Sequence, residues 1–166
     1  MEIWDGYNAD GTLAGVDLIR GEEIPRGIYH LVCEILVRHT DGDYLLMQRD
    51  FSKEGYPGFF EATAGGSALK GEDKFGCAKR ELFEETGIDS DTFEEIGCNR
   101  SHNTIYHCYL CVTDWDKNRV TLQEGETISF KWLSEKEFAD FVNSEDMIDV
   151  QRQRLDGFCR KMGYVK

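Results

Sequence analysis

Three glutamates, Glu81, Glu84 and Glu85, are spaced so that they share one side of a helix. Residues three or four positions apart are neighbours on a helix surface, and like charges at that spacing destabilise the helix by roughly 0.2–0.5 kcal/mol per pair. A cation would neutralise the cluster, and hard carboxylate oxygens suit Mg²⁺ or Mn²⁺. Because Mg²⁺ is usually held by a few carboxylates together with substrate phosphates, the cluster predicts chemistry at a phosphate group.

The segment around these acids has the pattern of a capped helix with one apolar side. The helix is expected to run from about Glu72 to Thr86, and Gly87 follows where a left-handed cap is favoured. At ~100° per residue, Phe75, Ala78 and Leu82 should form the buried face. The alternative is a solvated acidic helix face, which explains a bare Glu-Glu pair in an acidic protein but not a whole pattern of fixed residue types.

The stretch from Gly66 to Ile88, GSALKGEDKFGCAKRELFEETGI, resembles the Nudix box, GX5EX7REUXEEXGU with U an aliphatic residue, and matches it at every fixed position. The resemblance implies a Mg²⁺-dependent hydrolase that cuts a diphosphate linked to another group. It also implies an α/β (α+β) fold in which a mixed sheet lies between helices. The chain would then form one Nudix domain over residues 1–166.

The resemblance also assigns roles to the acids. Glu81, Glu84 and Glu85 would bind the metal, and the carbonyl oxygen of Gly65, directly before the box, could join them. The implied mechanism is attack of water on a bridging diphosphate. The general base would be Glu81, Glu85 or the later Glu124, three alternatives between which the sequence does not decide.

The remaining residues of the box are expected to shape the site. Arg80 projects ~100° away from Glu81 on a helix, so it should brace a glutamate of the box rather than bind substrate. Glu72 would shape the loop–helix turn or contact the metal through water. Gly66 opens the box with a tight turn, and Gly87 ends the helix.

Several residues outside the box are candidates for the same site. Arg49 could hold a phosphate oxygen through two hydrogen bonds, or form a surface salt bridge. Glu124 and Glu126 lie in the late loop QEGET, from which several Nudix hydrolases supply a metal ligand or general base; exposed loop acids are the alternative. Four aromatic residues before the box could stack on a substrate group or belong to the core: Phe51, Tyr56, Phe59 and Phe60.

Composition limits the class of protein. A chain of 166 residues with 40% hydrophobic and 12% aromatic residues can form one globular domain with a real core. The net charge of −13 argues against a nucleic-acid surface, which would need a basic patch. The opening MEIWDGYNADG lacks the basic and apolar regions of a signal peptide, and no apolar run approaches the ~20 residues of a membrane span. A cytoplasmic location is therefore expected.

The six cysteines are scattered through apolar segments. Without a secretion signal they are expected to be reduced thiols in the core rather than a disulfide framework. Cys108 and Cys111 form a C-x-x-C pair near His102 and His107, which leaves a zinc site as an alternative. No second C-x-x-C pair supports that alternative.

Hydrophobic periodicity and turn residues predict a mixed α/β chain with three parts: an N-terminal hairpin over 1–20, a core over 28–143 and a last helix over 144–163. The expected strands after the hairpin are Tyr29–Arg38, Tyr44–Arg49, Thr92–Asn99, Thr104–Thr113 and Ile128–Leu133. A capping box at Ser134–Glu137 should start a helix to about Asn143, and a longer helix should follow over Ser144–Met162.

Two other functions compete with diphosphate hydrolysis. The segments WDGYNADG and GEEIPRGIYHLV resemble the isopentenyl diphosphate isomerase branch of the family. Those isomerases place a catalytic cysteine and a metal-binding histidine where this chain has Gly65 and Ser67, so only His30 could match one of their ligands. The second alternative is a non-catalytic domain that senses a ligand, but such domains usually lose box glutamates. A nucleoside diphosphate linked to another group is the expected substrate, and the exposed edges of the hairpin are compatible with a homodimer.

Overall fold

The computed structural model describes residues 1–166. The strands are β1 (Ile3–Tyr7), β2 (Leu13–Ile19), β3 (His30–His39), β4 (Tyr44–Arg49), β5 (Phe60–Glu61), β6 (Thr63–Ser67), β7 (Glu94–Ser101), β8 (Thr104–Thr113) and β9 (Thr127–Leu133). The helices are α1 (Lys74–Thr86), α2 (Glu135–Val142) and α3 (Asp149–Lys161), with one 3₁₀ turn at Lys117–Arg119. None of these helices is long and apolar enough to cross a membrane.

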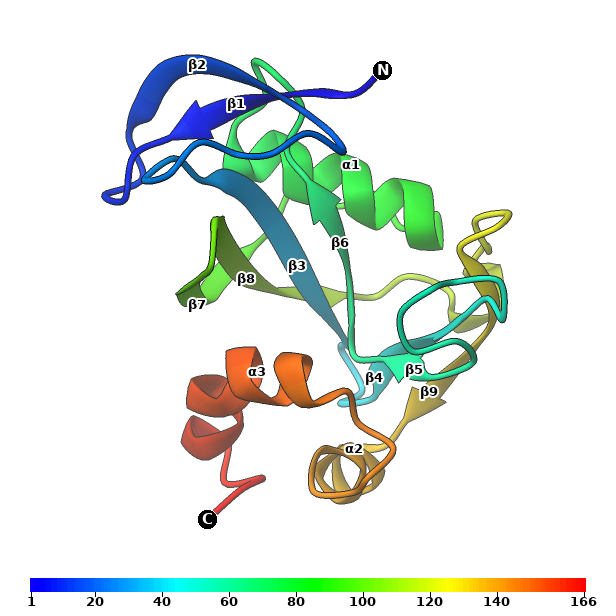
Figure 1. Cartoon of the computed structure of the whole chain (residues 1–166). Coiled ribbons are helices and arrows are strands. Elements are labelled where there is room, and N and C mark those ends of the chain that lie inside the picture. Colours follow the sequence, from blue (N-terminus) through cyan, green and yellow to red (C-terminus); the bar gives the residue numbers. More distant parts are fainter.

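The expected mixed sheet between helices is confirmed. The main sheet has the strand order β5-β4-β3-β8-β7, with β6 also paired to β3 and β9 to β4. β3 and β8 run parallel, whereas the other pairings are antiparallel. Figure 1 shows α1 on one side of this sheet and α2 and α3 on the other.

Side chains of the central strands point alternately to the two faces of the sheet and form a core on each side. In β3, Cys33 and Ile35 face the cluster that includes Leu82 of α1, whereas Leu36 faces the cluster built with α2 and α3. β4 divides in the same way, because successive side chains of a strand point to opposite faces. A sheet that is buried on both faces explains why these segments read as continuous apolar runs.

The N-terminal hairpin lies beside the box helix rather than extending the main sheet. β1 and β2 pair antiparallel, as expected, and form a separate two-stranded sheet. The backbone of Tyr7 exchanges two hydrogen bonds with that of Tyr29, at 2.8 and 2.9 Å. The Trp4 ring stacks on His30 at 4.6 Å between centroids. These contacts fix the hairpin over the start of β3.

Helix α1 begins two residues after the expected position, and Ala78 and Leu82 are buried on it as expected. Asp73 caps it by accepting a hydrogen bond from the Gly76 N–H at 2.7 Å, and Gly87 ends it with φ 75°. The prediction that Phe75 is buried is wrong: it lies in the first turn and is 48% exposed. The buried residues of the helix are Cys77, Ala78, Leu82 and Thr86.

The last helix starts five residues later than the sequence predicted. α2 has the expected capping box at Ser134 and ends at Val142. The chain then turns, because Arg152 donates from Nε to the Val142 carbonyl at 2.8 Å and from Nη2 to the Ser144 carbonyl. These bonds satisfy carbonyl groups at the end of α2, so α3 begins only at Asp149.

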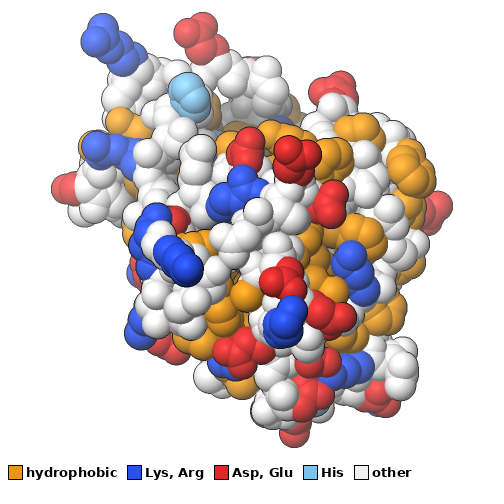
Figure 2. All heavy atoms as spheres, turned by 90° about the horizontal axis from the view of Figure 1, so that it is seen from below, with side chains coloured by type: hydrophobic (Ala, Val, Ile, Leu, Met, Phe, Trp, Pro, Cys, Tyr) orange, Lys and Arg blue, Asp and Glu red, His pale blue; other side chains and the backbone are white.

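Figure 2 views the molecule from below, where acidic and basic side chains are interspersed among apolar ones.

Candidate active site

A polar cavity of about 390 Å³ opens beside the Nudix-box segment. Only two of its twenty lining residues are hydrophobic, so it suits a highly polar ligand rather than an apolar one. The walls come from β3, β4, β5, β6, α1, α3, the loop before β9 and the N-terminal hairpin. Residues far apart in the sequence therefore meet at the box.

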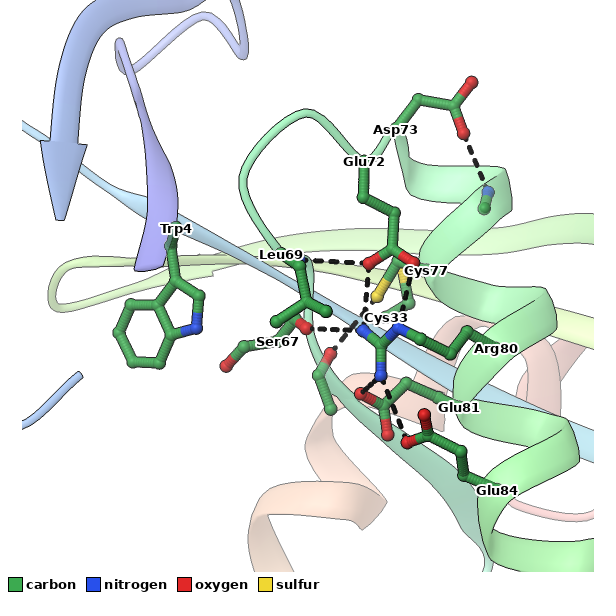
Figure 3. Close-up of polar contacts among 12 residues, drawn as sticks. Trp4, Cys33, Ser67, Leu69, Glu72, Asp73, Cys77, Arg80, Glu81 and Glu84 are labelled. Carbon is green, nitrogen blue, oxygen red and sulfur yellow. Dashed lines mark hydrogen bonds and ion pairs between the residues drawn. The ribbon is translucent and has the colours of Figure 1, made fainter. Parts of the chain in front are cut away.

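Arg80 lies at the centre of a hydrogen-bond network among the box residues (Figure 3). Its Nε and Nη2 donate to the two carboxylate oxygens of Glu72, each at 2.9 Å. Its Nη1 donates to Glu81 at 2.6 Å and to Glu84 at 3.2 Å, and Nη2 also donates to the Ser67 carbonyl at 2.9 Å. The hydrogen bond to Glu72 is the leading cause of a raised pKa for Arg80. One guanidinium thus ties the loop before α1 to two acids of the helix.

Two glycines allow the loop to approach its neighbours closely. A Cβ atom on Gly66 would lie 2.5 Å from an oxygen of Glu81. A Cβ atom on Gly65 would lie 2.0 Å from the backbone carbonyl oxygen of Cys33 in β3. A side chain at Gly65 would have to displace the backbone of β3, whereas one at Gly66 would displace the Glu81 carboxylate.

Glu85 is the most perturbed of the three clustered acids. Its Oε2 accepts a hydrogen bond from the Gly65 N–H at 3.1 Å. Burial raises the pKa of Glu85 well above its usual value, and repulsion from Glu61 and Glu81 raises it further. Burial also raises the pKa of Glu81, although Arg80 opposes that shift. A cation between these acids would relieve both the burial and the repulsion.

The donor set of the box fits a hard cation. Glu81, Glu84 and Glu85 all line the cavity, as does Gly65. The carboxylate oxygens of the three glutamates are not all within 4.8 Å of one another. The reason is that Arg80 binds Glu81 and Glu84 on its own side. Glu85 is half-buried and has no cationic partner, and this is the observation that calls for a positive charge.

A second layer of partly buried ion pairs faces the same cavity, and the sequence indicated neither the partner of Arg49 nor the other pair. Arg49 of β4 donates from Nη1 to Glu61 at 2.7 Å, and Nη1 of Arg154 in α3 pairs with Glu34 of β3. Burial raises the pKa of both acids, and the paired arginines oppose the shift. Glu34, an acid within the otherwise apolar run LVCEILV, was the signal that could have revealed it. Arg49 lines the cavity, as proposed, but its guanidinium is already engaged by Glu61.

The loop before β9 contributes Glu126 to the cavity, and not Glu124, which the sequence suggested as a general base. Glu126 lines the cavity and pairs with Lys53, whereas Glu124 is exposed and lies outside the cavity lining. The turn at Gly125, which has φ 76°, separates the two. Arg20 and Glu2 of the N-terminal hairpin also line the cavity and had no local sequence signal.

The aromatic residues before the box lie away from the cavity. Phe60 packs against the core beneath α2 and α3, with Lys131 Nζ 4.0 Å from its ring centroid. Phe51, Tyr56 and Phe59 are exposed, and none of the four lines the cavity. The expectation that they face the candidate site is not met, because β5 turns Phe60 to the opposite side of the sheet.

The C-x-x-C zinc alternative is wrong. Cys108 and Cys111 are fully buried free thiols, in agreement with core cysteines. Residues three positions apart on a strand point to opposite faces, so the two thiols cannot share an ion. Cys111 lies in the core beneath α1, whereas the Cys108 thiol faces Glu34 at 3.7 Å.

Comparison with known proteins agrees with this geometry. The family model of the NUDIX domain matches residues 29–153. An uncharacterized Nudix hydrolase of Listeria monocytogenes is 33% identical over 150 residues, a span of 89% of each chain. The crystal structure of DR0079 from Deinococcus radiodurans superposes with a TM-score of 0.72 at 17% identity, covering 95% of this chain and 99% of that one. The NUDIX domain of Shewanella oneidensis NrtR, solved with ADP ribose, gives a TM-score of 0.61 at 17% identity, covering 81% and 88%.

These likenesses agree with the box sequence, the mixed sheet and the placement of the acids beside a polar cavity. The NUDIX match extends over most of the chain, and the Listeria relative aligns along nearly its whole length. This chain therefore belongs to the Nudix hydrolase family.

Proposed function

We propose that this chain is a Mg²⁺-dependent hydrolase that cleaves the phosphoanhydride bond of a nucleoside diphosphate linked to another group. The observation that carries the proposal is Glu85, a half-buried carboxyl without a cationic partner on the wall of a polar cavity. The ADP ribose bound to the Shewanella domain is a compound of the proposed class, and it supports this choice of substrate. Small-molecule phosphates also suit a cavity wall that is almost entirely polar.

The residues proposed to hold the metal are Glu81, Glu84 and Glu85, with the Gly65 carbonyl oxygen as a further ligand. When bound, Mg²⁺ or Mn²⁺ would supply positive charge that polarises phosphoryl oxygens and lowers the pKa of water. Arg80 holds Glu81 and Glu84 in place before any ion arrives. Its role in the proposal is therefore to position the carboxylates, in agreement with the interpretation from sequence.

Basic side chains around the cavity would bind the phosphates. Arg49, Lys53 and Arg20 enter from three different segments of the chain. Arg49 is oriented by Glu61 and by the Gly55 carbonyl, to which its Nε donates at 2.7 Å. Preorganised cations of this kind stabilise the negative charge that develops during phosphoryl transfer.

We assign the general base to Glu85. Of the three candidates, Glu124 lies outside the cavity and Glu81 is already bound by Arg80. Glu85 lines the cavity, and the Gly65 N–H donates to its Oε2 at 3.1 Å, which orients the carboxylate to accept a proton from water. Glu126, which lines the cavity, is the loop acid that we propose to contact the substrate or metal in place of Glu124.

A panel of diphosphate compounds tests the proposal. Nucleoside diphosphates, ADP ribose and isopentenyl diphosphate would be incubated with and without Mg²⁺, and release of phosphate or nucleoside monophosphate measured. Glu85→Gln should lower turnover by about 10²–10⁴-fold while the protein stays folded. Glu94→Gln is the matched control, because Glu94 is an exposed glutamate outside the cavity lining.

Each other outcome points to one of the alternatives. Tight Mg²⁺-dependent binding of a panel compound without turnover would make the chain a sensor. Migration of the double bond in isopentenyl diphosphate would make it an isomerase. Equal turnover by Glu85→Gln and wild type would remove Glu85 from the mechanism.

A further inference from the structure

Three side chains of metal-binding types meet on the edge of the sheet, outside the cavity. They are Glu95 and Cys98 of β7 and His107 of β8. Their ligand atoms all lie within 4.8 Å of one another, and Glu95 Oε1 is 3.0 Å from His107 Nδ1. None of the three lines the polar cavity, so the cluster is separate from the box acids.

A β-bulge creates this cluster. Glu95 pairs with Tyr109 and Cys98 with His107, and the register shifts between Glu95 and Gly97. In a regular strand, residues three positions apart point to opposite faces. The extra residue of the bulge brings Glu95 onto the face shared by Cys98 and His107, and bulges commonly re-aim side chains in this way.

The ligand types match a transition metal better than magnesium. We propose that Glu95, Cys98 and His107 form a binding site for Zn²⁺ or a similar divalent transition-metal ion, with solvent in the fourth position. Thiolate, imidazole and carboxylate are the ligands of protein zinc sites, whereas a thiolate is foreign to Mg²⁺ sites. Ligand bonds of ~2.0–2.3 Å in a tetrahedron place the donors about 3.5 Å apart, so modest side-chain rotations complete the site.

Two contacts orient the ligands of this cluster. The His107 ring lies nearly parallel to that of the buried Tyr109, with 19° between the planes, and its Nδ1 faces Glu95 Oε1. Lys74 Nζ pairs with the second oxygen of Glu95 at 2.9 Å, so Oε1 is the oxygen left for the ion. A thiolate and a carboxylate together would balance the charge of a divalent ion. Lys74 can stay on the outer oxygen of Glu95 and orient it.

Cys98 gives a direct handle on the site, because it is the exposed cysteine among six free thiols, of which the other five are buried. Co²⁺ is the first probe, since a cysteine thiolate bound to it produces a near-ultraviolet charge-transfer band that carboxylate and water ligands do not. Zn²⁺ is the second probe, and its protection of the thiol is followed with an aromatic disulfide reagent. Both titrations are run in excess Mg²⁺, so that hard carboxylate sites are filled.

We expect a charge-transfer band that saturates at one Co²⁺ per chain and is abolished by added Zn²⁺. Zn²⁺ should slow modification of Cys98 in the folded protein. Cys98→Ser should abolish the band. Glu95→Gln and His107→Gln should each weaken Zn²⁺ binding by at least ~10–100-fold, the loss that even an outer partner of a metal ligand produces.

His102→Asn is the matched control, because His102 is an exposed histidine on the adjoining turn, outside the cluster. Its φ of 52° is one that asparagine tolerates. This variant should bind Co²⁺ as wild type does. Absence of the band in wild type, or its persistence in Cys98→Ser, would overturn the proposal. Equal binding by wild type, Glu95→Gln and His107→Gln would overturn it as well, and none of these readouts depends on hydrolysis.

Discussion

The bracing of the box acids by Arg80 leads to a sharp prediction about stability. Arg80→Met keeps most of the side-chain volume but removes every donor of the guanidinium. Glu72 and Glu81 would then stay near each other without their cation. The loss should therefore exceed the value of the hydrogen bonds themselves, because partly buried charges are left unpaired.

The magnitude follows from the exposure of the pair. Breaking a fully buried ion pair costs about 3–5 kcal/mol. The side chains here are 23% exposed for Arg80, 17% for Glu72 and 12% for Glu81, so solvent reduces the penalty. We expect the variant to lose about 2–4 kcal/mol of unfolding free energy, which corresponds to roughly 4–16 °C in Tm for a domain of this size.

Thermal unfolding in a chelator, followed by circular dichroism, measures the effect. Arg160→Met is the control, because its pair with Asp156 is largely exposed and should contribute only ~0–1 kcal/mol. Added Mg²⁺ should recover part of the loss, since the ion neutralises some of the same acids. If Arg80→Met and Arg160→Met have the same Tm in chelator, the argument that Arg80 compensates partly buried charge is wrong.

Burial raises the pKa of Glu85 above the value near 4.5 that it has when unfolded, so the folded state binds the proton more tightly. The contribution of Glu85 to the stability of the chelated protein should therefore be fully present below that value and be lost as pH rises through the folded-state pKa, each unit of difference costing about 1.4 kcal/mol. The difference in Tm between wild type and Glu85→Gln in chelator should accordingly shift against wild type from pH 5 to 8, and Mg²⁺ should remove that shift; a difference that does not change with pH would contradict the assignment. Gly65→Ala forces a Cβ atom to within 2.0 Å of a carbonyl oxygen of β3, so a loss at or above the upper end of the ~1–3 kcal/mol typical of overpacking is expected in chemical denaturation. Gly157→Ala in α3 meets open space and should instead add about 0.8–1.0 kcal/mol of helix stability; equal stabilities for these two alanine variants would refute the packing argument.

The fold could be predicted closely wherever local pattern and burial agree. The bounds predicted for Tyr44–Arg49 and Thr104–Thr113 coincide with β4 and β8. These segments are apolar runs between clear turns. The start of α3 was predicted five residues too early, because the turn before it depends on bonds from Arg152 to carbonyl groups of residues eight and ten positions earlier.

The site could be predicted only as far as one contiguous motif reached. The box spacing placed the clustered glutamates on one helix, and the structure sets all three beside the cavity. Contacts between distant segments were not visible, such as Arg154 of α3 meeting Glu34 of β3. The choice between Glu124 and Glu126 depended on the conformation of a glycine turn, which periodicity does not describe.

The pair formed by Arg154 and Glu34 also bears on how the protein is made. Glu34 lies in the strand at the middle of the sheet, and its partner is supplied by the last helix of the chain. During synthesis, β3 and the box helix would leave the ribosome well before α3. Until that helix docks, a carboxylate on the cavity wall has no counter-charge, so the nascent protein should complete the wall of its polar cavity only once α3 has emerged.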